Sequence, residues 1–421
     1  MKLITTTALA LFAASFAARA AAQYAAPTPR AQSQTQPAAE TAAAKPSGPQ
    51  VKPSSKALKA IVDLQDAVNK KDWASVPAKV AAAQAVASTK EDRYLIGSLQ
   101  LRAAAAANDS VAFASALENV GQTGLVDNAT MASMYTNLGG SFLNNKQYSD
   151  AAAAYQKAVA LNPNNTDALT FLGESQSAAG QKAEAAATFQ RAIRARVAAG
   201  QKPDEDLMKR AVATAYEGKS PAATDLARQW VAAYPSPDSW SNAIAIYSNL
   251  NETDTEAKVD LFRLMQATGS LNNATVYEQY AAAAADLNNT NEAQAVLDAG
   301  LASKVLSPTD ARYREIAAGV KAKPRATAAD LQVATKSAVN GMALLRIGDR
   351  YYGMGDYAKA VELYRMAMGK PGVDPALANL HIGMALARAG DKAGATTALN
   401  AVSGSRADIA KYWLLYVNQK A

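Results

Sequence analysis

Three groups of residues in the chain have types and spacings that could do chemistry. The first is the segment 213–220, which ends in Gly218-Lys219-Ser220 and matches a relaxed phosphate-binding loop. Such a loop needs a strand before it and glycines whose backbone N–H groups hold phosphate. The preceding residues 207–217 instead have a helical pattern and no glycine, so the sequence favours a turn between two helices.

The other two groups concern metal binding. Asp286, Asn288 and Thr290 have the alternate spacing of a calcium loop, but Leu297 stands where the closing glutamate is needed and the central glycine is missing. His381 is the single histidine, and there is no cysteine. Multi-histidine and thiolate metal sites are therefore excluded. His381 is interpreted either as a polar contact on a concave face or as a packed surface residue, and the second interpretation is favoured.

Composition and motifs together argue against catalysis. The sequence contains no G-x-S-x-G, S-x-x-K or H-E-x-x-H motif. Its formal net charge of +7 is spread over 421 residues without a dense basic run, which indicates no nucleic-acid surface. Without cysteine there is no disulfide and no thiol nucleophile. We expect a non-enzymatic protein that uses no cofactor and no metal.

Residues 1–22 have the organisation of a secretory signal peptide. Lys2 supplies the positive end, residues 3–18 are apolar and alanine-rich, and Ala20 and Ala22 offer small residues for cleavage. The apolar stretch is short for a membrane-spanning helix, which needs about 20 residues. We therefore expect a cleaved leader and a periplasmic protein, or else a secreted one. An uncleaved membrane anchor is the alternative.

Composition then divides the rest of the chain. The segment 23–56 is rich in Pro, Ala and Gln and almost without large apolar residues, which predicts a disordered linker. From residue 57 onward apolar residues recur at helical spacing. The predicted order is degenerate helical repeats over 57–130, two strong repeat units over 131–199, degenerate repeats over 200–340, and two further units with a terminal helix over 341–421.

Four segments share a signature of small and large residues. Each has a Leu-Gly or Ile-Gly pair, then an alanine, then a large residue four positions later. The first two glycines lie 34 residues apart and the last two 35. Proline restricts the residue before it and ends the first unit. The signature residues are Leu138, Gly139, Ala151, Tyr155, Pro163, Leu172, Gly173, Ala185, Phe189, Ile347, Gly348, Ala360, Tyr364, Ile382, Gly383, Ala395 and Leu399.

This signature resembles that of the tetratricopeptide repeat, a helix–turn–helix unit of 34 residues. The resemblance is strong over 132–199 and 341–402 and weak over 57–121 and 206–307. It implies an all-α protein, an α-solenoid whose units stack as a right-handed superhelix, because one unit cannot bury its apolar face alone. Glycine costs about 1 kcal/mol of helix propensity, so its recurrence predicts a close approach between the two helices of a unit.

The resemblance also implies a concave face, lined by the first helix of each unit, that binds a peptide or protein segment. The candidate contact residues are Asn137, Asn144, Glu174, Arg346, Asp349, Tyr352, His381 and Arg388. Some family members hold a C-terminal carboxylate in a clamp of Lys, Asn and Arg. Exposed first-helix positions here carry Thr136, Asn137 and Gly140 instead, so that ligand is not expected.

A terminal helix is predicted over 407–418, with apolar residues around most of its circumference. A helix that ends a repeat array normally keeps a polar outer face. One interpretation is that Tyr412, Trp413 and their neighbours cover the last repeat. The other is that Trp413, Leu414 and Leu415 form a contact site for a second subunit or a partner.

The functional hypothesis is a protein–protein interaction scaffold of the bacterial periplasm or cell envelope. Its partner is a protein or peptide, not nucleic acid, and no stable membrane insertion follows signal cleavage. One alternative is an envelope enzyme, such as a cell-wall or polysaccharide hydrolase, with its site in 206–340; a second distinct fold there would support it. Another is a self-assembling structural protein that uses the terminal helix.

Overall fold

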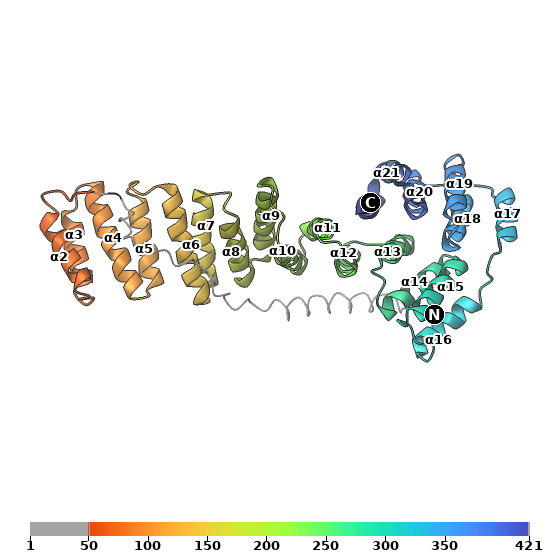
Figure 1. The fold of residues 1–421 in the computed structure, drawn as a ribbon, viewed down its shortest axis with the longest axis horizontal. Helices are drawn as coiled ribbons and strands as arrows, with labels where there is room; N and C mark the ends of the chain where they lie inside the picture. The colour runs from red at the N-terminus through yellow and green to blue at the C-terminus, as the bar shows by residue number, and fades with distance from the viewer. Residues whose placement is uncertain (1–48, 50, 420–421) are drawn as a thin grey trace, which may run out of the picture. The chain divides into compact units, whose positions relative to one another are not determined.

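The computed structural model describes residues 49 and 51–419, and this part of the chain contains 21 α-helices and no strand (Figure 1). The expected all-α class and its solenoid of paired helices are confirmed. The predicted signal peptide and most of the predicted linker, residues 23–48 and 50, lie outside the described residues. The chain divides into two compact units, with the boundary between Ala222 and Ala223.

The N-terminal unit is a row of consecutive helix pairs, which follow one another in chain order in Figure 1. Each helix packs mainly on the next one along the chain. The helices are α2 (Leu58–Asn69), α3 (Val76–Val86), α4 (Lys90–Ala106), α5 (Ser110–Gly121), α6 (Asn128–Asn144), α7 (Tyr148–Leu161), α8 (Thr166–Ala178), α9 (Lys182–Ala198) and α10 (Glu205–Glu217).

The C-terminal unit begins with further pairs and ends with a helix that returns to its start. Its helices are α11 (Ala222–Ala233), α12 (Pro237–Leu250), α13 (Thr255–Thr268), α14 (Ala274–Asp286), α15 (Thr290–Ala302), α16 (Ala311–Lys321), α17 (Ala328–Ser337), α18 (Gly341–Gly353), α19 (Tyr357–Met368), α20 (Pro375–Ala389), α21 (Lys392–Asn400) and α22 (Ala407–Gln419). A 3₁₀ turn, Gly404–Arg406, precedes α22. No helix among the described residues has the length and apolar character needed to cross a membrane.

One left-handed residue makes the turn inside most helix pairs. A positive φ ends the first helix and turns the chain directly into the second. The residues in this position are Lys71, Asn108, Lys146, Gly180, Lys219, Asn288, Gly355 and Gly390. Five of these eight are not glycine, so the degenerate units use the same turn as the strong ones, although their sequences do not reveal it.

The signature glycines let the two helices of a unit touch, as the sequence predicts. A Cβ added to Gly139 would lie 2.8 Å from the ring of Tyr155, and one added to Gly173 would lie 2.8 Å from Phe189. The small residue on the first helix therefore receives the large residue of the second. The same contact recurs in the degenerate pair α4–α5, where a Cβ on Gly97 would meet a methyl group of Val120 at 2.7 Å.

Substitution of Gly348 tests this packing. A Cβ there would lie 2.5 Å from Tyr364 Cε1, and Tyr364 is fully buried. We expect Gly348→Ala to lower the free energy of unfolding by about 1–2 kcal/mol, because overpacking outweighs the gain in helix propensity. Gly319→Ala on α16 is the matched control, since a Cβ there meets nothing within 4 Å. Thermal melts should show the control unchanged or stabilised; equal effects of both substitutions would contradict the packing argument.

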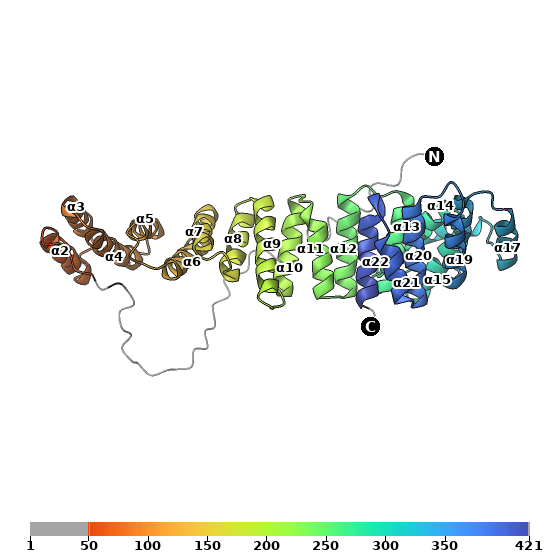
Figure 2. The same cartoon turned by 90° about the horizontal axis from the view of Figure 1, so that it is seen from above.

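The last helix closes the C-terminal unit. Helix α22 packs on α21, α20 and α13, and Figure 2 shows it beside α12 and α13. Tyr412 Oη donates to the Ala243 carbonyl at 3.2 Å, Gln419 Nε2 donates to the Val231 carbonyl at 2.9 Å, and Arg228 pairs with Asp408 at 3.2 Å.

This closure decides between the two interpretations of the terminal helix. Tyr412 and Trp413 are fully buried, whereas Leu414 and Leu415 are half-buried. Trp413 is therefore a core residue, and the prediction that it belongs to an exposed contact site is wrong. Helix α22 covers α12 and α13, which end more than 130 residues earlier in the chain, as well as the last repeat.

The described chain begins on a fixed segment. Asp92 accepts hydrogen bonds from the backbone N–H and the hydroxyl of Ser54, both at 2.8 Å, and from the Ser88 N–H at 3.0 Å. Ser54 lies inside the predicted linker 23–56. The last residues of that segment are therefore held against the start of α4.

Candidate functional site

The first helices of the strong N-terminal pairs, α6 and α8, present a polar face. Asn137 and Asn144 of α6 are exposed, and their side chains form no hydrogen bond with any described residue. Glu174 of α8 is half-buried and forms an ion pair with Arg210 of α10. Burial raises the pKa of Glu174, and Arg210 offsets only part of this effect. Of the three predicted contact residues in this unit, Asn137 and Asn144 therefore have side chains that remain able to hydrogen-bond to a partner.

The C-terminal unit, by contrast, buries its charged residues at one centre. We call this centre the charge cluster, and its members come from α13, α15, α18 and α20. Each member is 5% exposed or less. The cluster consists of Asp260, Arg263, Glu292, Asp349 and His381.

Arg263 is the central cation of the charge cluster. Its Nε and Nη2 atoms each donate to a different oxygen of Glu292 at 2.8 Å, a bidentate pair. Its Nη1 atom also donates to Asp260 and Asp349, both at 3.4 Å. The guanidinium lies 4.5 Å from the ring centre of Tyr352. Arginine suits this position because its planar group combines bidentate pairing with stacking on an aromatic ring.

His381 lies between two carboxylates. Its Nδ1 is 2.9 Å from Asp349 and its Nε2 is 3.2 Å from Asp260. Burial alone would lower the pKa of His381, but the Asp349 and Asp260 carboxylates outweigh it and raise the pKa to about 10. Burial opposes the charge of Asp349 too, yet His381 and Arg263 hold the pKa of that carboxyl well below its usual range. His381 and Asp349 are therefore both charged at neutral pH.

Further groups pair with the cluster's carboxylates. Tyr280 Oη donates to Glu292 at 2.6 Å, and Tyr364 Oη donates to Asp349 at 2.9 Å. Arg346 Nη1 donates to Asp349 at 3.4 Å. Buried charges are tolerated only when attraction to opposite charges offsets the cost of removing them from water. Here each carboxylate lies next to a cation. The arrangement joins four helices; it does not present a surface to a ligand.

Several of the predicted contact residues meet in this cluster instead of lining an exposed face. Asp349, Tyr352 and His381 are buried, and Arg346 is two-thirds buried. The prediction that Asp349, Tyr352 and His381 are exposed concave contacts is wrong. Helices α13, α15 and α22 cover the face of α18 and α20 on which these residues lie. Arg388 lies apart and donates to Tyr357 Oη at 3.0 Å.

Three cluster members were not predicted from the sequence. Asp260 and Arg263 interrupt an apolar run from Val259 to Met265, and Glu292 follows the turn at Asn288. Charged residues within a run that otherwise reads as buried are a usable signal for a buried ion pair. The partners could not be identified, since Asp349 lies 86 residues from Arg263.

The charge cluster makes stability depend on pH. The folded-state pKa of His381, about 10, exceeds its ordinary value of 6.5, so the folded chain holds a proton that the unfolded chain has lost between these values. We expect the free energy of unfolding to fall as pH rises from 6.5 to 10, by up to about 1.4 kcal/mol per pH unit. Asp349 acts oppositely, and its contribution is lost below its ordinary pKa of 3.8.

Urea unfolding across this pH range measures the effect. The control is His381→Gln, which we expect to be less stable than the native chain at pH 6. Because it lacks the titrating imidazole, its alkaline slope should be smaller than that of the native chain. Equal alkaline slopes for the two proteins would show that His381 does not carry a raised pKa.

The other sequence motifs form turns. Residues 213–217 belong to α10, and Lys219 has φ 51° in the turn to α11, so the segment lacks the strand that a phosphate loop follows. Asn288 has φ 58° in the turn between α14 and α15. Within the described residues no group of three or more carboxylate or histidine side chains is placed to hold a metal ion. The favoured interpretation of both segments, a helix–helix turn, is confirmed.

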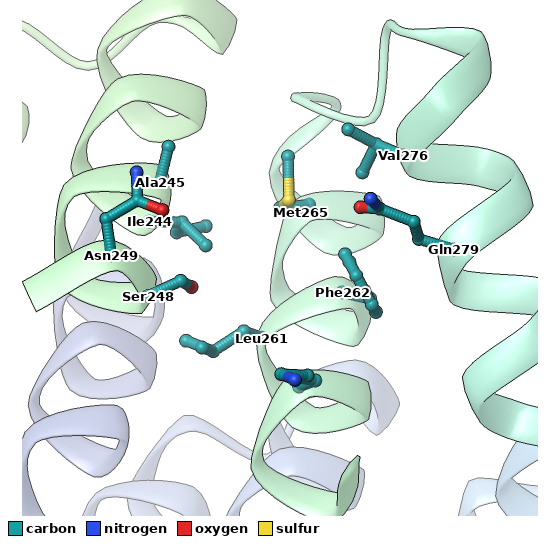
Figure 3. A pocket seen from close by; sticks show the side chains of 10 residues that line it. Ile244, Ala245, Ser248, Asn249, Leu261, Phe262, Met265, Val276 and Gln279 are labelled. Atoms are coloured by element: carbon teal, nitrogen blue, oxygen red, sulfur yellow. The ribbon is translucent and has the colours of Figure 1, made fainter. Parts of the chain in front are cut away.

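A hollow in the C-terminal unit lies between α12, α13 and α14 (Figure 3). Leu261, Phe262 and Met265 of α13 lie between Ile244 of α12 and Val276 of α14. Its volume of about 40 Å³ holds a few water molecules, far less than the 300–1,000 Å³ typical of ligand pockets. It is too small to be the functional site.

The middle of the chain continues the helical pairs. Residues 206–340 contain most of α10 and all of α11–α17. Helix α16 packs on α14 and α15, and α17 packs on α18. The second distinct fold that would have supported an enzyme in this region is not present among the described residues.

A sequence comparison decides the family of the repeats. Residues 136–203 and 345–408 match the family model described as the tetratricopeptide repeat. These two segments are tetratricopeptide repeats. The matched segments cover most of α6–α9 and α18–α21, the helix pairs with the signature glycines. Tetratricopeptide repeats generally mediate protein–protein interactions and are typically non-catalytic. No curated protein sequence matches the chain.

Several solved structures resemble this chain at 12% sequence identity. A tetratricopeptide repeat protein from Parabacteroides merdae matches with a TM-score of 0.23, over 79% of this chain and 100% of the other. Yeast Tom70 matches with a TM-score of 0.22, over 86% and 88%. The pentatricopeptide repeat protein PPR10 from maize matches with a TM-score of 0.25, over 84% and 61%.

Proposed function

We propose that this protein is a non-enzymatic interaction scaffold whose N-terminal unit binds a protein or peptide segment. The observation that carries the proposal is the contrast between the two units. The exposed amides of Asn137 and Asn144 on α6 have no partner among the described residues. In contrast, Asp349 of α18 and His381 of α20 are buried and paired within the charge cluster. A rigid helix with uncommitted amides is suited to peptide recognition, because amides donate and accept hydrogen bonds.

The partner-binding surface would include Asn137, Asn144 and Glu174. The close glycine contacts hold α6 and α8 against α7 and α9, so these side chains stand on a fixed backbone. A preformed surface loses little conformational entropy when a partner binds. Glu174, paired with Arg210, would supply charge of both signs at the edge of the same surface.

Charge-bearing substitutions on α6 test this function. In the full chain, Asn137→Arg combined with Asn144→Arg should abolish crosslinks to the partner in the native cell envelope, read by mass spectrometry. The matched control is Asn272→Arg with Asn418→Arg, two exposed asparagines of the C-terminal unit. Crosslinked partners that are unchanged in the α6 variant would refute the assignment of this surface.

We further propose that the protein is exported to the periplasm. The support is the sequence of residues 1–22, with a positive end, an apolar stretch and small residues at the cleavage positions. Intact mass spectrometry of the protein from a fractionated bacterial host checks this. Cleavage after Ala20 or Ala22 and recovery in the periplasmic fraction are the expected results; an intact leader on a membrane-bound chain would indicate the anchor instead.

A further inference from the structure

A polar groove of about 470 Å³ lies in the N-terminal unit, among α3, α4 and α5. Its volume falls in the range of about 300–1,000 Å³ typical of ligand sites. Most of the lining residues are charged or amide side chains, and Ala87 and Ile96 add an apolar part. The polar residues that matter for the argument are Gln84, Lys90, Arg93, Gln100, Asn119 and Gln122.

The groove carries unpaired positive charge. Lys90 and Arg93 are both exposed, and neither forms an ion pair with a described residue. They are three residues apart on α4, so they stand on one face of the helix. The described residues that line the groove include no carboxylate. The groove therefore favours an anionic ligand.

The amide side chains of the groove require a ligand that can both donate and accept hydrogen bonds. Each amide side chain can donate and accept, which matches the alternating N–H and C=O groups of a peptide backbone. The Oε1 atom of Gln100 is shielded from solvent and accepts no hydrogen bond from any described residue. An unsatisfied acceptor destabilises the free protein, so turning this amide toward a ligand N–H would favour binding. A simple anion offers no such donor.

The spacing of these groups gives the size of the ligand. Lys90 and Gln100 are ten positions apart, which is about 15 Å along a helix at 1.5 Å per residue. An extended peptide advances about 3.3 Å per residue, so about four or five residues span this distance. A short linear segment therefore fits the groove better than a small molecule with one charged group.

We propose that this groove binds an extended acidic peptide segment of a protein partner. Lys90 and Arg93 pair with its carboxylates, and Gln100, Asn119 and Gln122 bind its backbone. The inference rests on the proposed scaffold function, since it names the chemistry of a bound partner segment. It places that segment against α3, α4 and α5, apart from the residues of α6 and α8 named above.

Peptide binding to the full-length protein tests the proposal. Fluorescence anisotropy with a labelled acidic hexapeptide of Glu and Asp should show saturable binding that weakens with added salt. Lys90→Glu combined with Arg93→Glu should weaken it at least about tenfold, because each cation is lost and replaced by repulsion. The matched control, Lys56→Glu with Lys59→Glu, makes the same change in net charge on exposed residues outside the groove.

A second variant removes the unsatisfied acceptor without changing charge. Gln100→Leu should leave the melting temperature equal or higher, and should weaken peptide binding by about threefold to tenfold. Equal binding of a neutral Gln/Asn hexapeptide, competition by inorganic phosphate at the same concentration, or equal loss in the control variant would each overturn the proposal. If the acidic peptide fails to bind while the α6 variant still loses its crosslinked partners, the groove assignment falls and the scaffold function stands.

Discussion

Replacement of Arg263 by methionine is expected to lower the free energy of unfolding of the C-terminal unit by about 3–5 kcal/mol. Arg263 is 2% exposed and pairs with three buried carboxylates, those of Glu292, Asp260 and Asp349. Methionine has a similar length but leaves these charges without their central cation. The cost comes from the uncompensated charges rather than from lost volume.

Two comparisons make the Arg263 prediction specific. Lys359→Met removes a half-exposed ion pair with Glu362 in the same unit and should cost less than about 1 kcal/mol. In Arg263→Met the orphaned carboxylates should take up protons more readily, so the variant should regain stability as pH falls from 7 to 5. Urea unfolding followed by circular dichroism measures both effects. Equal losses in the two variants, with no recovery in acid, would show that Arg263 is not the centre of a buried network.

Substitution of Trp413 by alanine should have a similarly large effect. Trp413 has no exposed surface, and its ring lies 5.6 Å from that of Tyr416 on the same helix. Removing a fully buried tryptophan typically costs about 3–5 kcal/mol. Because α22 joins the end of the C-terminal unit to α11, α12 and α13, we expect the loss to appear across the whole unit.

Leu414 provides the matched control for Trp413. It is the next residue on α22 and is half-buried, so Leu414→Ala should cost about 1 kcal/mol or less. Thermal unfolding and hydrogen exchange over residues 223–419 separate the two variants. A stable Trp413→Ala protein that loses self-association or partner binding would restore the idea that Trp413 belongs to an intermolecular contact.

The helix pairs could be predicted from the sequence because their signal is local. Gly139 and Tyr155, or Gly173 and Phe189, are 16 residues apart, so one turn brings them into contact. The turn residue itself was less visible. Lys71 and Lys219 adopt the left-handed conformation that Gly180 adopts in the strong repeat. Lysine has no preference for this conformation, so it cannot be predicted from the residue type.

The charge cluster and the closure of the C-terminal unit could not be predicted, because both depend on residues far apart in the chain. Asp349 meets Arg263 from 86 residues away, and Asp408 meets Arg228 from 180. The burial of His381 cannot be predicted from the sequence for the same reason. On an isolated repeat its helix face would be open, and only the return of the chain covers it.

The titration of His381 tests most directly the claim that the charge cluster buries the first-helix face of α18 and α20, so that this face is not open to a partner. His381 is the only histidine in the chain, so nuclear magnetic resonance of ¹⁵N-histidine-labelled protein reports on it alone. We expect a doubly protonated imidazolium through neutral pH, with a pKa of about 10. Titration near the ordinary value of 6.5, as for a solvent-exposed histidine, would contradict the account and return this face of α20 to the list of partner-binding surfaces.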